Sequence, residues 1–332
     1  MKKFLAVSAI TILSFTVAHA DEPQAPPTDY VDVAAHIAKT MRANHYNPAE
    51  LETPGYKQVE AAVAALAQTA GSDEAFIAGF RAIWRDGPFS HVELNPARGT
   101  ADDVAAYLDN LRIGGGGAVL TWRGDVAILT VNTMMGLDTI EEIDAAYATI
   151  ADKGADSLII DLRENGGGAF AVRPLVGHVI DQPFDAGGFV SQRWNAENHH
   201  APTASDMKAV EPWDGWSIRA FWADVQDAPV IRVRFAPVEP IFEGPVYVLT
   251  SKRTASAAEL AADAFKISGR AKIIGETTAG QMLSQKIFDV PGGFQLSLPI
   301  ADYYSAENGR IEGVGVAPDI ETGAAMDIAL SQ

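Results

Sequence analysis

Apolar positions in the first third of the chain recur at helical spacing. Two apolar stripes indicate the first two predicted helices. They consist of Val31, Ala34, Ala35 and Ala38, and then of Val59, Val63, Leu66 and Ala67. A cap-like Ser72-Asp73-Glu74 precedes a third stripe, Phe76, Ile77, Phe80 and Ile83. The pattern predicts a small helical N-terminal domain over residues 30–115, with a further helix at about 101–112.

Beyond residue 115 the pattern changes to short apolar, β-rich runs that alternate with helical segments. Strands are expected at 118–122, 125–131, 157–162, 245–250 and 272–275, and helices at 138–153, 169–180 and 256–268. Short turns between strands and helices are typical of a parallel-rich α/β core, here residues 116–325. Near its end the chain predicts a hairpin, 285–290 with 294–300.

Residues 183–244 lack a clear period and read as an irregular insertion that holds four of the six tryptophans. Such an insertion often covers a site, so it is either a lid or substrate wall or an aromatic mini-core under a loop. His199 and His200 suggest a metal, but adjacent histidines on a strand cannot both face one ion. We expect no metal site.

The first 20 residues have the features of a secretory signal. Lys2 and Lys3 precede an apolar run, and Ala18-His19-Ala20 is a small-x-small cleavage site. The apolar run is too short for a stable membrane span, and residues 21–29 read as a flexible leader. We therefore expect a protein exported across the inner membrane, into the periplasm.

Composition excludes several classes of function. The formal net charge is −18, and loss of Lys2 and Lys3 makes it more negative, which argues against nucleic acid and anionic membranes as partners. The chain has no cysteine, so thiol catalysis and cysteine-ligated metals are excluded. Nothing in the sequence predicts the oligomeric state.

One short stretch combines a buried strand, a polar turn and a helix. In Val246–Phe265, Ser256 falls where the helix begins, so its hydroxyl would stand above the sheet beside the free N–H groups of the first helical turn. This is a suitable place for a nucleophile. It is also the ordinary place for an N-cap serine, and the stretch alone favours the cap.

Other stretches offer partners for a serine nucleophile. Gly166, Gly167 and Gly168 follow a predicted buried strand, where backbone N–H groups can approach a substrate carbonyl closely, although a tight turn explains them equally. Candidate bases are His91, beside Ser90, and Glu312. The glycine run 114–117 lacks the lysine and helix of a phosphate loop and is interpreted as a flexible turn.

Together these stretches resemble an ordered family signature. The segments DLRENGGG, TASAAELAADAF, GETTAG, the hairpin and IEGVGVAPDI are similar to the C-terminal (tail-specific) processing serine peptidases, over roughly residues 120–322. The resemblance implies a crotonase-like (ββα) peptidase core in an α/β fold. It also implies Ser256 as nucleophile, with Ala257 and a glycine of 166–168, preferably Gly167, as oxyanion donors.

The sequence departs from the tail-specific branch at the base. That branch has a lysine where this chain has Gln281, which cannot act as a base, and Lys286 would serve only after a register slip. A PDZ domain is also missing between His91 and the core. The chain instead resembles the tricorn protease core and the interphotoreceptor retinoid-binding protein, which implies His91 as base with Ser90 and Glu312 completing a tetrad.

These observations predict a secreted serine endopeptidase that acts on peptides or proteins through an acyl-enzyme, without a metal or organic cofactor. One rival is a non-catalytic periplasmic protein of the same fold that binds an apolar or peptide ligand. Another rival, an α/β-hydrolase esterase, is disfavoured because the residues flanking Ser256 lack the glycines of a nucleophile elbow.

Overall fold

The computed structural model describes residues 28–198 and 200–332. The predicted signal and most of the leader lie outside this range, as does His199. No helix in the described part of the chain has the length and apolar character needed to cross a membrane.

The N-terminal segment is helical, as predicted. Each helix begins at a side-chain cap; Ser72, for example, accepts the N–H of Ala75 at the start of the third helix. The elements are α1 (Tyr30–Asn44), the 3-10 helix η1 (Pro48–Glu52), α2 (Pro54–Ala67), α3 (Asp73–Trp84), β1 (Glu93–Pro96) and α4 (Ala101–Asp109).

The α/β core contains a six-stranded sheet in the order β12-β8-β7-β4-β3-β2, parallel except for β2. Its strands are β2 (Ala118–Arg123), β3 (Val126–Val131), β4 (Ser157–Asp161), β7 (Val246–Thr250), β8 (Ala271–Gly275) and β12 (Ile320–Glu321). Helices α5 (Leu137–Lys153), α6 (Val172–Gly177) and α10 (Ala257–Ser268) share a core with one face, and α11 (Ala325–Leu330) packs on the other. Both faces are covered, so strands such as β4 are buried almost throughout.

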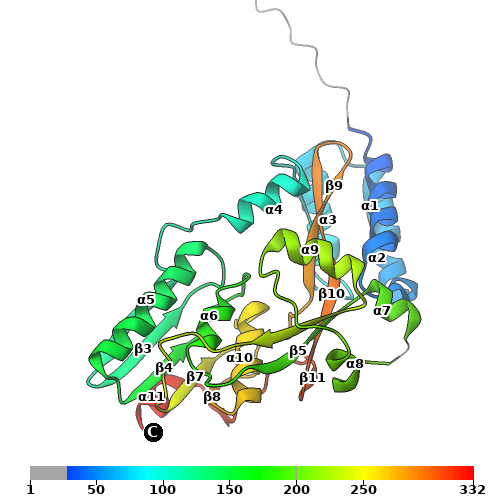
Figure 1. Cartoon of the computed structure of the whole chain (residues 1–332). Helices are drawn as coiled ribbons and strands as arrows, with labels where there is room; N and C mark the ends of the chain where they lie inside the picture. Colours follow the sequence, from blue (N-terminus) through cyan, green and yellow to red (C-terminus); the bar gives the residue numbers. More distant parts are fainter. Residues whose placement is uncertain (1–27, 199) are drawn as a thin grey trace, which may run out of the picture.

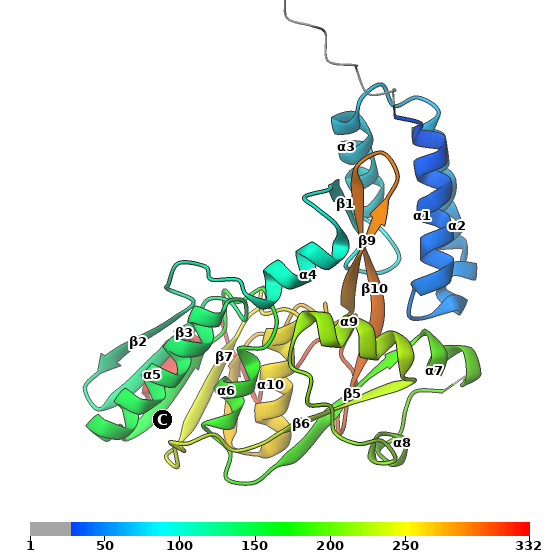
Figure 2. The same cartoon turned by 45° about the horizontal axis from the view of Figure 1, so that its top comes forward.

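A second, antiparallel sheet is organised around one long strand, β10 (Phe294–Ser305). Its partners are β1, β9 (Ser284–Val290), β5 (Phe184–Ser191) and β11 (Gly309–Arg310), and β6 (Val230–Phe235) pairs with β5. The predicted terminal hairpin is β9 with β10. Figure 1 shows this hairpin among the N-terminal helices, and Figure 2 shows it projecting from the α/β core.

The expected domain boundary near residue 115 does not separate two cores. Helices α1 to α3 bury a common apolar cluster with Val290, Phe294, Leu296 and Leu298 of the hairpin. Strand β1 also pairs with β10. The loop between α3 and β1, which carries Ser90 and His91, is therefore anchored on the same strands that lead to the core.

The prediction that residues 183–244 are irregular is wrong. The segment contains β5 and β6 and the short helices α7 (Gln192–Glu197), α8 (Ala204–Lys208) and α9 (Ile218–Asp227). Strand β5 has no alternating pattern, because its inner positions are buried and include Gly187 and Gly188. Its partners lie far away along the chain, so the local sequence carries little sign of the strand.

Candidate active site

Two turns meet at the carboxyl ends of the neighbouring parallel strands β4 and β7. Thr254 Oγ1 donates to the Leu162 carbonyl at 2.9 Å, and the Ala255 N–H donates to the Asn165 carbonyl at 3.0 Å. The predicted nucleophile turn and the predicted glycine turn thus form one unit. Parallel pairing brings them together because equivalent strand ends lie at the same edge of the sheet.

Ser256 occupies the N-cap position of α10, so the capping interpretation is correct as to position. Its backbone is unusual: φ is 55° and ψ is −124°, a conformation that non-glycine residues seldom adopt. Such strain persists only where the surroundings impose it, and it clusters at functional sites. A plain cap has an extended backbone, as at Ser72 of this chain.

Glu259, which the sequence interpretation overlooked, holds this turn in place. Its buried carboxylate accepts the N–H groups of Ser256 (3.0 Å), Gly280 (2.7 Å) and Gln281 (2.9 Å) and the hydroxyl of Thr278 (2.6 Å). Burial raises the pKa of Glu259, and these four donors oppose the rise. The Ser-x-x-Glu spacing of a capping box was the available signal.

His91 and Ser90 lie in the loop between α3 and β1. Phe89 anchors this loop, with ring centroids 4.3 Å from His45 and 5.2 Å from Trp84. His91 has a positive φ of 62°. Burial lowers the pKa of His91, while Glu312 and Glu93 oppose this by favouring the charged imidazolium. A neutral imidazole at neutral pH is the state that a general base requires.

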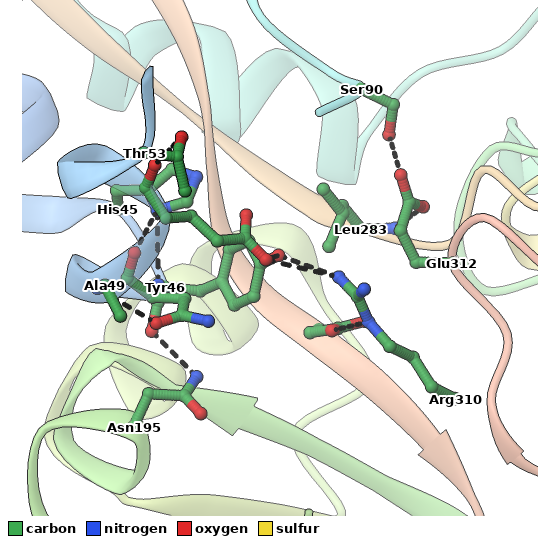
Figure 3. Close-up of polar contacts among 12 residues, drawn as sticks. His45, Tyr46, Ala49, Thr53, Ser90, Asn195, Leu283, Arg310 and Glu312 are labelled. Atoms are coloured by element: carbon green, nitrogen blue, oxygen red, sulfur yellow. Dashed lines mark hydrogen bonds and ion pairs between the residues drawn. The ribbon is translucent and has the colours of Figure 1, made fainter. Parts of the chain in front are cut away.

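Ser90 connects His91 to Glu312. Ser90 Oγ lies 2.6 Å from His91 Nδ1 and donates to Glu312 Oε1 at 2.8 Å, a contact that Figure 3 shows. The second carboxylate oxygen of Glu312 accepts the N–H groups of Met282 (2.6 Å) and Leu283 (3.1 Å). The three predicted residues Ser90, His91 and Glu312 therefore come together from opposite ends of the chain.

Proton counting assigns the tautomer of His91. A carboxylate only accepts, so the Ser90 hydroxyl hydrogen points to Glu312 and Ser90 Oγ accepts from His91 Nδ1–H. This leaves His91 Nε2 without a proton, as a base needs. His91 and Ser256 line one cavity of about 490 Å³, but they form no direct hydrogen bond in the described structure.

The structure corrects one of the three predicted oxyanion donors. The N–H of Gly167, the preferred candidate, donates to Asn165 Oδ1 at 2.8 Å and is not free. Gly166 and Ala257 line the cavity beside Ser256, and among the described residues their N–H groups have no hydrogen-bond acceptor. Gly167 instead lets two turns approach: a Cβ there would lie 2.6 Å from Ser256 Cβ.

Neither of the two positions considered for a lysine base, 281 and 286, lines the cavity. Gln281 is exposed and is tied to Glu259 through its backbone N–H. Lys286 binds Gln226 and lies over the ring of Phe288, and it does not line the cavity although its strand neighbours Gln285 and Ile287 do. A side chain on the opposite face of a strand cannot reach Ser256 without the register slip.

The tryptophans of the segment 183–244 fall into two groups. Trp213, Trp216 and Trp222 line the cavity and form a wall. Trp194 instead packs in a separate small core with Val190, Met207 and Val230. Among the described residues, no group of histidine, aspartate and glutamate side chains is arranged to hold a metal ion.

Comparison with known proteins agrees with this arrangement. Residues 125–322 match peptidase family S41. A carboxyl-terminal-processing protease of Picosynechococcus sp. is 26% identical over 178 residues, which are 54% of this chain and 34% of that protein. This chain thus spans about a third of the length of such curated relatives.

Solved structures show the same fold. A lipoprotein from Streptococcus agalactiae has a TM-score of 0.58 at 17% identity, covering 94% of this chain and 98% of that one. The tricorn protease has a TM-score of 0.54 at 14% identity, covering 91% of this chain and 35% of its own. The family match extends over more than half of the residues and includes both turns described above, and we conclude that the chain belongs to peptidase family S41.

Proposed function

We propose that the protein is a serine endopeptidase, exported from the cytoplasm, that cleaves peptides through an acyl-enzyme. Ser256 is the nucleophile and His91 the base, with Ser90 and Glu312 orienting the imidazole. The observation that carries the proposal is that Ser256 and His91 line one cavity, with Ser90 Oγ 2.6 Å from His91 Nδ1. The relatives named carboxyl-terminal-processing proteases support a peptide or protein substrate.

In the first step, Ser256 Oγ attacks the substrate carbonyl carbon while His91 Nε2 takes the hydroxyl proton. Negative charge develops on the carbonyl oxygen, where the N–H groups of Ala257 and Gly166 can bind it, aided by the dipole of α10. His91 then gives its proton to the leaving amine as the C–N bond breaks. Water, activated by His91, hydrolyses the remaining ester of Ser256.

Ser90 and Glu312 act through His91. When the imidazole gains a proton, the Glu312 carboxylate stabilises its charge through the Ser90 hydroxyl. The same relay keeps the Nδ1 proton in place between turnovers. Because His91 and Ser256 are not hydrogen-bonded in the free protein, their contact has to tighten when substrate binds.

A fluorophosphonate probe tests the nucleophile. We expect it to label the wild-type protein and to fail with Ser256→Ala; labelling that survives this substitution would exclude Ser256. His91→Ala should abolish peptide cleavage, whereas Gln281→Ala, the matched change at the position of the lysine in the other branch, should not. If nothing is labelled or cleaved and native mass spectrometry finds a bound apolar molecule, the binding-protein alternative is correct.

A further inference from the structure

Backbone strain singles out a third residue at the cavity. In the described part of the chain, three non-glycine residues have a positive φ: His91 (62°), Ser256 (55°) and Trp216 (33°). All three line the same cavity. A positive φ is rare for a bulky side chain, and it persists only where packing imposes it. Trp216 has no part in the proposed acyl transfer, so its strain needs another explanation.

Packing from several elements fixes the indole of Trp216. Its ring lies 5.6 Å from Trp213, 5.9 Å from Phe235 and 6.0 Å from Phe170, the last in an edge-to-face arrangement. The guanidinium of Arg173 lies 5.5 Å from the ring centre. These contacts come from α6, β6 and the loop before α9, so Trp216 is a rigid part of the wall.

The other tryptophans of the wall also present apolar faces. Trp222 Nε1 donates to the Gln285 carbonyl at 2.8 Å, and Trp213 Nε1 donates to Asp224 Oδ2 at 2.8 Å. With their N–H groups bound elsewhere, these two indoles leave carbon atoms for a ligand. Gln285 belongs to β9, so the hydrogen bond from Trp222 connects the tryptophan wall to this strand. The strand begins just after Met282 and Leu283, whose N–H groups bind Glu312.

Among the described residues, the cavity lining contains no aspartate, glutamate, lysine or arginine, and His91 is its one titratable side chain. Apart from His91 and the indoles of the tryptophans, its polar side chains are those of Ser256, Ser284 and Gln285. A charged group placed inside would lose water without gaining a partner, a large cost. The volume of about 490 Å³ lies within the range of roughly 300–1,000 Å³ that is typical of ligand pockets, so the cavity has room for a large side chain.

We propose that this cavity binds the side chain of the substrate residue whose carbonyl is attacked, and that it selects a large uncharged group, aromatic or branched aliphatic. Trp216 is the specificity-determining residue. The inference rests on the proposed peptidase activity. It follows because that side chain is joined to the carbon next to the carbonyl that Ser256 attacks, and the cavity opens beside Ser256.

Quenched fluorescent peptides that differ only at this acyl-side residue test the proposal. We expect kcat/KM for Phe and Leu to exceed that for Lys and Glu by about 100-fold or more. Trp216→Asp combined with Arg173→Gln places an unpaired carboxylate in the wall, because Arg173 would otherwise neutralise it, and should raise the Lys/Phe ratio by about tenfold or more. Trp122→Asp, a half-buried tryptophan outside the cavity, is the matched control and should leave the ratio unchanged.

Fluorophosphonate labelling of each variant distinguishes a failure of the specificity assignment from a failure of the proposed peptidase activity. Wild-type protein that is labelled at Ser256 but shows equal rates for all acyl-side residues overturns the specificity assignment alone. A preference found only for the residue after the scissile bond, or a Lys/Phe ratio that Trp216→Asp with Arg173→Gln does not change, overturns it as well. Absence of labelling in the wild type overturns the proposed activity and the inference with it.

Discussion

Replacing Glu312 by glutamine tests the relay most directly. The carboxylate accepts three hydrogen bonds, from Ser90 Oγ, Met282 N and Leu283 N. Glutamine has one accepting oxygen, which will face the two fixed N–H groups, so its amide nitrogen must donate to Ser90. The Ser90 hydroxyl then turns and donates to His91 Nδ1. This moves the imidazole proton to Nε2, the wrong tautomer for a base.

The expected loss follows from these contacts. A hydrogen bond to a charged group contributes about 1.5–3 kcal/mol, or roughly 10- to 150-fold in rate if it acts in the transition state. General base catalysis contributes about 10² to 10⁴-fold. Glu312→Gln should therefore lower kcat by about 10²- to 10⁴-fold. Its stability should change by less than about 1 kcal/mol, because the two backbone N–H groups keep an acceptor.

The assay is peptide cleavage, with the rate of fluorophosphonate labelling and urea unfolding measured in parallel. Glu93→Gln is the matched control, since this exposed carboxylate also acts on His91 electrostatically but does not contact Ser90. Ser90→Ala should be as slow as Glu312→Gln, and the double variant no slower, because both break one relay. A folded Glu312→Gln protein with wild-type kcat would refute the reasoning.

Further predictions concern the glycine turn, the pH profile and a buried acid. Gly167→Ala should prevent fluorophosphonate labelling and destabilise the protein, because the new Cβ would lie 2.7 Å from the Ala255 carbonyl oxygen and position 167 has a φ of 99°. At Gly166 a Cβ would meet nothing within 4 Å, so Gly166→Ala should remain folded in urea titrations. Because burial lowers the pKa of His91 and the base must be neutral, kcat/KM should rise with pH to a plateau, with a midpoint below the ordinary 6.5; a midpoint above this value would contradict the assignment. Burial raises the pKa of Asp302 to about 7, so this group stabilises the fold least at high pH: its contribution is lost as pH rises from about 4 to 7, by up to about 1.4 kcal/mol per unit. Asp302→Asn should flatten that part of the stability profile, as measured by urea unfolding at several pH values, and an unchanged slope would argue against the shift.

Local sequence determined much of the peptidase core. The strand, turn and helix around Ser256, the glycine turn after β4 and the alternation of strands and helices all follow from residues close in the chain. Hydrophobic period and turn chemistry act over a few residues, so they can be recognised without knowing the partners. The resemblance at Ser90 and Glu312 also identified the residues that the structure joins to His91.

Tertiary structure decided the rest. Strands β5 and β6 were missed because their burial comes from β10 and from helices far away in sequence. The sequence suggested Gly167 as a donor, but its N–H is bound to Asn165, and Glu259 became visible only when its four donors converged. Burial, hydrogen-bond partners and pKa depend on groups brought together by folding, and a residue's neighbours in sequence do not specify them.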